Sequence, residues 1–215
     1  MKPAASATRS PSGAAVSGSP TASPAAPSSP PTVPAGYTRV GGTAQGISLA
    51  APSSWVAVDL ANETLQSAAK KLNLHGISAS ALVQDMETLQ KAHGVFVMDV
   101  KAVVDGQQQF APNLNAYCSV SGVSDAGAAG VPFMKTLAAA EFEKLGATHI
   151  TQQDIQIGGV PGVETSYQLS SSSAGTVYAS QLEVLPKPDK VCEVTVTGEK
   201  QGNVVRTAAA TAQFP

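Results

Sequence analysis

The sequence is poor in charge and in aromatic side chains. Asp, Glu, Lys and Arg make up 13% of its 215 residues, Phe, Trp and Tyr make up 5%, and the formal net charge is −2. It has no cluster of Lys and Arg, which argues against a nucleic-acid-binding protein, because such proteins neutralise phosphates with grouped bases. It also has no apolar run near the roughly 18 residues that a membrane-spanning helix needs. The composition therefore favours neither a nucleic-acid partner nor a membrane span.

Residues 1–36 lack acidic and aromatic residues altogether. Ala, Ser, Pro, Gly and Thr fill 31 of these 36 positions. Such a segment buries too little apolar surface to offset the entropy lost on ordering it, and its prolines favour an extended spacer. We therefore predict a disordered Pro/Ser/Ala-rich linker over residues 1–36 and a single folded domain over residues 37–215. A domain of that length buries roughly 70% of its unfolded surface, so it folds without a metal or a disulfide. We expect a monomer without a cofactor.

Apolar and polar residues alternate in many segments of the folded part, and this alternation predicts strands. The predicted strands are residues 45–52, 55–59, 95–101, 116–120, 148–157, 163–169, 177–185 and 191–197. Helices are grouped between the early strands, whereas long strands follow one another in the second half. This order favours an α+β fold, with a central antiparallel β-sheet sandwiched by helices, over an alternating parallel fold.

Four segments have apolar residues three or four positions apart, which predicts helices. The first begins with Asn62 as its N-cap and ends at Gly76, and the second begins at Ser80 and ends with Gly94 in a left-handed conformation. The third runs from Pro132 to Gly146. The last covers residues 203–210, although its Val204 and Val205 would also suit a strand. Four residues are expected to form the apolar side of the third helix: Phe133, Leu137, Phe142 and Leu145.

Short motifs follow one another in a recognisable order. They are Gly46-Ile-Ser-Leu-Ala-Ala-Pro52 followed by Trp55, Phe110-Ala-Pro-Asn-Leu-Asn115, Leu145-Gly146, Ile157-Gly-Gly-Val-Pro-Gly162 leading to Tyr167, and Val191-Cys-Glu-Val-Thr-Val-Thr197. Over residues 40–215 this order resembles the PsbP-like superfamily and, within it, the LpqN-type lipoproteins of actinobacteria. The resemblance implies a central antiparallel sheet between layers of helix. It also implies a binding or accessory role in the cell envelope.

The segment after Met1-Lys2-Pro3 contains no apolar core of a secretory signal. The Pro-rich spacer is nevertheless typical of a domain held away from a membrane by the lipidated cysteine of a lipoprotein. We expect an extracytoplasmic protein, secreted or tethered to the outer face of the cell membrane, through a lipid anchor absent from this chain. The alternative is a cytoplasmic protein with a disordered tail.

The two cysteines, Cys118 and Cys192, both fall in predicted strands. If these strands are neighbours and the protein is exported, a disulfide between them closes a long loop and stabilises the fold by about 4 kcal/mol. The alternative is a pair of unrelated buried thiols, because free cysteine is among the most buried residue types. The sequence leaves both open.

Patterns that resemble catalytic or metal-binding motifs are incomplete. Ser67-Ala-Ala-Lys70 matches the Ser-x-x-Lys of penicillin-recognising enzymes, but the Lys-Thr-Gly and Ser-Asp-Asn that accompany it are missing. Gly122-Val-Ser124 lacks the final glycine of Gly-x-Ser-x-Gly. The three histidines have no second ligand at helical spacing: His75, His93 and His149. We therefore predict no catalytic, cofactor-binding or metal-binding residue, although carboxylates distant in sequence can still meet in space.

Because aromatic residues are scarce, four of them are candidates for lining a ligand cleft: Trp55, Phe110, Tyr117 and Tyr178. Core packing beneath the helices is the alternative for each. We expect a non-catalytic envelope domain that binds an unidentified envelope protein or a small apolar ligand. The alternatives are a hydrolase or transferase with an unrecognised site and a purely structural assembly factor. A cleft in which a Ser, a His and an acid meet favours the enzyme.

Overall fold

The computed structural model describes residues 31–72, 86–104, 111–171, 175–200 and 202–215. Residues 1–30 of the predicted linker therefore lie outside the described residues. The same holds for Gly76, the predicted end of the first helix, and for Ser80, the predicted start of the second. The candidate aromatic residue Phe110 also lies outside the described residues.

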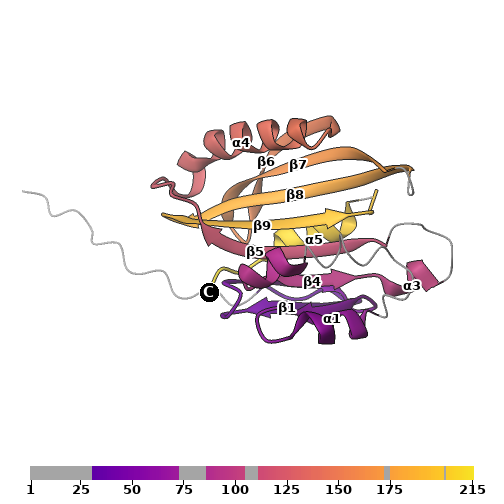
Figure 1. The fold of residues 1–215 in the computed structure, drawn as a ribbon. Helices are drawn as coiled ribbons and strands as arrows, with labels where there is room; N and C mark the ends of the chain where they lie inside the picture. The colour runs from indigo at the N-terminus through magenta and orange to yellow at the C-terminus, as the bar shows by residue number, and fades with distance from the viewer. Residues whose placement is uncertain (1–30, 73–85, 105–110, 172–174, 201) are drawn as a thin grey trace, which may run out of the picture.

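Seven antiparallel strands form the main sheet, in the order β3-β4-β5-β9-β8-β7-β6 (Figure 1). Their bounds are β3 Val56–Asp59, β4 Val95–Met98, β5 Asn113–Val120, β6 Thr148–Ile157, β7 Val160–Ser171, β8 Gly175–Lys187 and β9 Lys190–Thr197. After β5 the chain passes to the far edge at β6 and returns through β7 and β8, so that β9 pairs with β5. The predicted antiparallel sheet of an α+β fold is confirmed.

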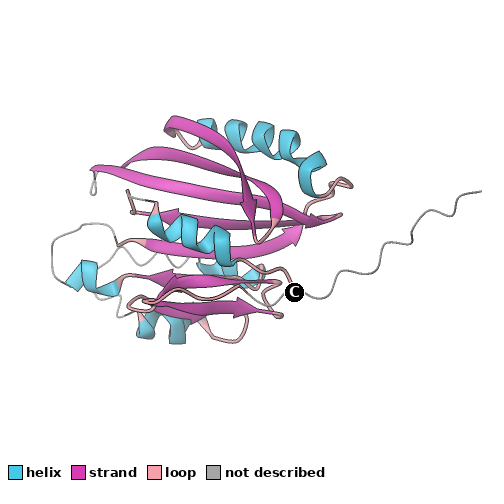
Figure 2. Cartoon of the chain, turned by 180° about the vertical axis from the view of Figure 1, so that it is seen from behind, coloured by secondary structure: helices cyan, strands magenta, loops and turns pink. Residues whose placement is uncertain are grey.

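One face of the main sheet, here called the α5 face, is covered by a helix and a separate hairpin. The helix is α5 (Asn203–Thr211), and the hairpin consists of β1 (Tyr37–Gly42) and β2 (Ile47–Pro52). Figure 2 shows both in front of the sheet. The apolar cluster that they form with the sheet includes Leu49, Val97, Leu114, Val194, Val205 and Ala208. The strand β1 was not predicted from the sequence.

The other face, here called the α4 face, is covered by helices. The helix α4 (Val131–Lys144), preceded by the 3₁₀ turn η1 (Gly127–Gly130), packs on β6, β7 and β8. The helix α1 (Leu65–Lys71) and the helical residues 86–91 pack on β3, β4 and β5. Strands thus dominate the molecule, and the predicted sandwich of helices is incomplete, because a β-hairpin covers part of the α5 face.

Helix ends and one strand end differ from the predictions. Thr64, not Asn62, caps α1, because its Oγ1 accepts the backbone N–H of Ser67 at 3.2 Å. The left-handed residue after residues 86–91 is His93, with φ of 53°, rather than Gly94. Space is tight at Gly94 for a different reason: a Cβ there would lie 3.1 Å from the carbonyl oxygens of Leu89 and Ala116. The strand predicted over residues 95–101 ends at residue 98, and Val100–Val104 forms the short helix α3.

The apolar side of α4 also differs from the prediction. Met134, Ala138 and Phe142 face the sheet and are buried. The expected residues Phe133, Leu137 and Leu145 are 46%, 52% and 60% exposed. The stripe with a spacing of four residues places the small Ala138 against the sheet, so that Phe142 can stack on Tyr167 with ring centroids 4.2 Å apart.

Candidate functional site

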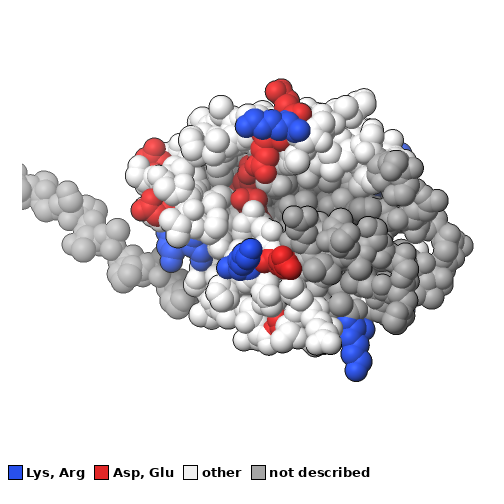
Figure 3. Space-filling view, in the orientation of Figure 1, with Lys and Arg blue, Asp and Glu red and all other residues white. Residues whose placement is uncertain are grey.

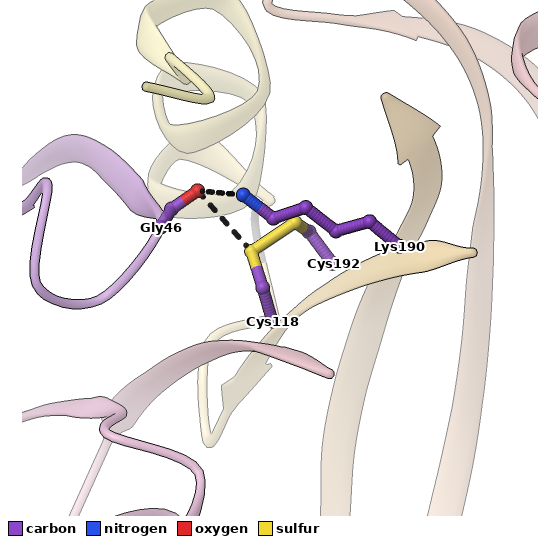
Figure 4. Close-up of a disulfide and its surroundings, with 4 residues drawn as sticks. All are labelled: Gly46, Cys118, Lys190 and Cys192. Carbon is purple, nitrogen blue, oxygen red and sulfur yellow. Dashed lines mark hydrogen bonds between the residues drawn. A yellow bond between two sulfur atoms is a disulfide. The ribbon is translucent and has the colours of Figure 1, made fainter. Parts of the chain in front are cut away.

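The two cysteines face each other across β5 and β9. In the register of these strands Cys118 pairs with Cys192, and their sulfur atoms form a disulfide with a Cα–Cα distance of 4.1 Å (Figure 4). The carbonyl oxygen of Gly46, in the turn between β1 and β2, accepts a hydrogen bond from Lys190 Nζ at 2.9 Å and lies 3.3 Å from Cys118 Sγ. The disulfide interpretation of the cysteines is confirmed, and the bond also contacts the hairpin on the α5 face.

The candidate aromatic residues do not converge on one cleft. Trp55 packs against the apolar cluster of the α5 face, whereas Tyr117 packs against the cluster beneath α1 on the α4 face. Tyr178 lies on β8 beside a polar pocket. Tyr117 thus lies on the α4 face, whereas Trp55 and Tyr178 lie on the α5 face, so the sheet separates Tyr117 from the other two. Of these three residues, Tyr178 lines the pocket.

A pocket of about 350 Å³ lies at the N-terminal end of α5. Its lining comes from β6, β7, β8 and the chain around the start of α5: His149, Thr151, Glu164, Ser166, Tyr167, Gln168, Tyr178, Ala179, Ser180, Glu199, Lys200, Gly202 and Arg206. Most of these side chains are polar. The pocket therefore differs in character from the apolar cleft that was expected.

Hydrogen bonds fix several side chains of this pocket. Ser166 Oγ and Ser180 Oγ lie 3.0 Å apart on neighbouring strands. Glu164 Oε2 accepts a bond from Gln153 Nε2 at 2.6 Å. The ammonium of Lys200 lies 5.1 Å from the centroid of the Tyr178 ring, which is within the range of a cation–π interaction. The pocket thus offers hydroxyl groups, an aromatic ring and charges of both signs.

A serine, a histidine and an acid all line this pocket, but they do not form a hydrogen-bonded triad. Ser166 Oγ donates to Glu164 Oε1 at 3.5 Å, and His149 Nδ1 lies 3.3 Å from Thr148 Oγ1. Within the described residues, no hydrogen bond joins His149 to either pocket serine. A base that activates a serine needs to lie within about 3.2 Å of it, although this distance is often longer without substrate.

A second polar site lies on the α4 face of the main sheet. The strand register places Tyr117 of β5 opposite Glu193 of β9, and Glu193 opposite Glu183 of β8. Glu141 of α4 interacts electrostatically with all three of these groups. Acidic side chains run from α4 down towards the sheet on this face (Figure 3). We call Glu141, Glu183 and Glu193 the glutamate cluster.

Two neutral side chains hold the carboxyl groups of the sheet in place. Tyr117 Oη donates to Glu193 Oε2 at 2.7 Å. Gln181 Nε2 donates to Glu183 Oε1 at 3.2 Å and to Glu193 Oε2 at 3.4 Å. Gln181 is itself held, because its Oε1 accepts from Thr195 Oγ1 at 3.3 Å. A connected network of side chains therefore spans β5, β9 and β8.

Burial shifts the protonation of this network. It raises the pKa of the Glu183 carboxyl to about 7, and the neighbouring Glu193 adds to the rise. The pKa of Glu193 is also raised by burial, although the hydrogen bond from Tyr117 opposes the rise. Burial and the nearby acids raise the pKa of the Tyr117 hydroxyl as well, and they raise that of Tyr167 to about 12. Near neutral pH the network can therefore gain or lose a proton.

The glutamate cluster was missed because its members are far apart in the sequence. One signal was available: Glu193 follows Cys192 directly, and Tyr117 precedes Cys118. A disulfide between directly opposed strand residues places Tyr117 and Glu193 opposite each other on the other face. The position of Glu183 requires the register between β8 and β9, which the two cysteines do not determine.

Two further findings limit the chemistry of the described residues. Among them, no three His, Cys, Asp or Glu side chains gather closely enough to hold a metal ion. No helix in the described part of the chain is long and apolar enough to cross a membrane.

No family model and no curated protein match the chain. It is similar to the solution structure of cyanobacterial PsbP (CyanoP) from Synechocystis sp. PCC 6803, with 15% identity and a TM-score of 0.44 over 84% of this chain and 94% of that one. It is also similar to the crystal structure of PA94, a Pseudomonas aeruginosa protein of unknown function, with 19% identity and a TM-score of 0.31. That match covers 42% of this chain and 60% of PA94, less than two thirds of its length. Neither likeness assigns a family, and the PsbP-like resemblance stays a prediction.

Proposed function

We propose that this chain is a non-catalytic binding domain of an exported cell-envelope protein, PsbP-like and of the LpqN type. In this proposal the domain binds a small polar ligand in the pocket beside α5. The family assignment is supported by the order of the sequence motifs. The binding role is supported by the pocket, and the export by the disulfide and the Pro-rich spacer.

The pocket is the observation that carries the binding role. Its hydroxyl pair, Ser166 and Ser180, and the ring of Tyr178 with Lys200 above it present hydrogen-bonding groups and a flat apolar surface side by side. Ligand sites commonly combine a few fixed polar groups with an aromatic surface. Because the lining is mostly polar, the proposed ligand is polar in place of the apolar one expected from the sequence.

The proposed export is supported by the Cys118–Cys192 disulfide. Disulfides form and persist in oxidising compartments and are rare in the cytosol of mesophiles. Fractionation of the host cell with an antibody against the folded domain tests the location. We expect the protein in the envelope or the medium, and a purely cytoplasmic signal would refute export.

Native mass spectrometry of the full chain purified from its own host tests the binding role. We expect a co-purifying small molecule, which is lost in a variant carrying Tyr178→Ala and Ser180→Ala. The matched control is Ser119→Ala, because Ser119 is an exposed serine at the end of β5. A ligand retained equally by all three proteins would place binding outside the pocket, and the absence of any bound mass would argue against a tightly held ligand.

A hydrolase is the second candidate, because Ser166, His149 and Glu164 line one pocket. A fluorophosphonate probe labels a serine only when a base activates it. Under the binding proposal we expect no labelling of the full chain. Labelling that disappears in Ser166→Ala but not in Ser180→Ala would favour the hydrolase instead.

A further inference from the structure

The glutamate cluster lies on the opposite face of the main sheet from the pocket, and the proposed function does not use it. The ion pairs found among the described residues are Lys71–Glu63 and Lys135–Asp154, and neither involves a member of the cluster. The three carboxyl groups therefore have no basic partner within the described part of the chain.

Glu183 shows most directly that a partner is missing. Its side chain is 7% exposed, and its Oε2 is buried without a hydrogen-bond partner among the described residues. A buried acceptor without a donor destabilises a fold by about 1–3 kcal/mol, and more when the group is charged. Buried polar atoms are therefore almost always paired, and an unpaired one calls for an explanation such as a bound water, an ion or a ligand.

The hydrogen bonds within the site leave one side of the carboxyl pair open. Tyr117 and Gln181 donate to Glu193 Oε2, and Gln181 also donates to Glu183 Oε1. The other oxygens, Glu183 Oε2 and Glu193 Oε1, have no donor among the described residues. Glu193 and Tyr117 are only partly buried, so the carboxyl pair borders solvent on their side.

We propose that the carboxyl pair of Glu183 and Glu193 is a binding site for a small organic cation with a primary ammonium or guanidinium group. Such a group brings three or five N–H donors and a positive charge, and a guanidinium spans two acceptor oxygens at once. A hard metal ion fits less well, because Ca²⁺ takes six to eight oxygen ligands and Mg²⁺ near-ideal octahedral geometry. The described residues around the pair do not form a metal-binding group of three.

A proton competes with the cation for this site. The charged and titratable groups around Glu183 are Glu193 of β9, Tyr117 of β5, Tyr167 of β7, Glu141 of α4 and, on the same face, the ion pair of Lys135 with Asp154. Because the pKa of Glu183 lies at about 7, only a few per cent of this carboxyl is ionised at pH 5.5. Cation binding should therefore be about 30-fold weaker at pH 5.5 than at pH 8.

The test is an NMR titration of the isotope-labelled full chain with agmatine, butylammonium chloride and, separately, calcium chloride. At about pH 8 we expect agmatine and butylammonium to shift amide resonances of β5, β8 and β9, and to do so far less at about pH 5.5. Glu183→Gln and Glu193→Gln should each weaken the binding at least tenfold. The matched control is Glu143→Gln, which removes an exposed acid from the same helix as Glu141 and should leave binding unchanged.

Three results would overturn the proposal. They are the absence of shifts with both organic cations, an equal loss of binding in Glu143→Gln, and binding of calcium alone. Amide spectra of each variant without ligand report whether it is folded. Loss of agmatine binding while the pocket ligand is retained separates this site from the pocket beside α5.

Discussion

At the scale of single residues, Phe142 carries the contact between α4 and the main sheet. It is 1% exposed, stacks on Tyr167 and belongs to the apolar cluster that includes Ala138 and Ala179. Leu137, five residues earlier on the same helix, is 52% exposed. Both residues are large and apolar, so comparing their alanine variants shows which side of α4 faces the sheet.

We expect Phe142→Ala to lower the free energy of unfolding by about 3–5 kcal/mol, because it removes a buried ring and leaves a cavity. Leu137→Ala should change it by less than about 0.5 kcal/mol, since little contact is lost at an exposed position. Urea denaturation followed by circular dichroism gives both values. Equal losses would mean that the buried side of α4 is assigned wrongly.

The carboxyl of Glu183 makes stability depend on pH. Its pKa is raised from 4.5 to about 7 in the folded protein, so between these values the folded state binds more protons than the unfolded state. Stability contributed by this group is therefore present at low pH and lost as the pH rises from about 4.5 to about 7. The full shift corresponds to at most about 3 kcal/mol.

Glu183→Gln removes this titration. We expect the variant to be more stable than the wild type at pH 8, and the gain to shrink towards pH 5, where the wild-type carboxyl is already protonated. Urea unfolding at several pH values measures the difference. A variant less stable than the wild type at pH 8 would contradict this account, whereas a more stable variant that no longer binds agmatine would indicate a carboxyl kept for binding.

At the scale of elements, α5 depends on an acid outside the helix. Its N-cap residue is Gly202, which has no side chain to accept the first N–H groups. The carboxylate of Glu199 does so instead, at 2.8 Å from the N–H nitrogen of Asn203 and 3.0 Å from that of Val204. This places a negative charge at the positive end of the helix dipole.

We expect Glu199→Ala to lower the free energy of unfolding by about 1 kcal/mol, the usual effect of removing an N-terminal cap. The control Glu143→Ala, near the C-terminal end of α4, should change it by less than about 0.5 kcal/mol. Thermal unfolding of the two variants beside the wild type measures both. If the two variants lose equal stability, the carboxylate of Glu199 does not cap α5.

The sequence predicted strands more accurately than helix faces. The 148–157 strand was predicted with its observed bounds, and the last helix to within one residue, because alternation and capping signals are local. On α4, the prediction of a buried Phe142 was confirmed, whereas Phe133 and Leu137 were wrongly predicted to be buried, since they are as apolar as the residues that face the sheet. Packing of the sheet around Ala138 decides which side of α4 is buried. The sequence of the helix alone does not show which side that is.

At the scale of the whole molecule, the two candidate sites are assembled in different ways. The pocket uses the consecutive strands β6, β7 and β8 with the chain that follows β9, whereas the glutamate cluster and Tyr117 come from segments that are far apart in the sequence. The pocket brings His149, Ser166 and Lys200 together, and the glutamate cluster joins α4 with β8 and β9. The residues of neither site have a characteristic spacing along the chain, so a search for sequence motifs does not find these sites. The contact between Tyr117 and Glu193 depends on the crossover that returns β9 to the centre of the sheet beside β5.

The Cys118–Cys192 disulfide joins the two strands at this crossover and closes a loop with a sequence separation of 74. In the loop-entropy model such a bond stabilises the folded state by about 4 kcal/mol, because it restricts the unfolded chain. It also holds Tyr117 and Glu193 opposite each other on the α4 face.

We therefore expect the double variant Cys118→Ala and Cys192→Ala to unfold at a lower urea concentration, with a loss of about 4 kcal/mol. Removing both sulfurs leaves no free thiol, so the loss reports the missing cross-link and a small change in packing. The wild type with a reducing agent should show the same loss, and the double variant should be indifferent to that agent. A double variant as stable as the oxidised wild type would mean that hydrogen bonds and apolar packing alone hold β9 against β5.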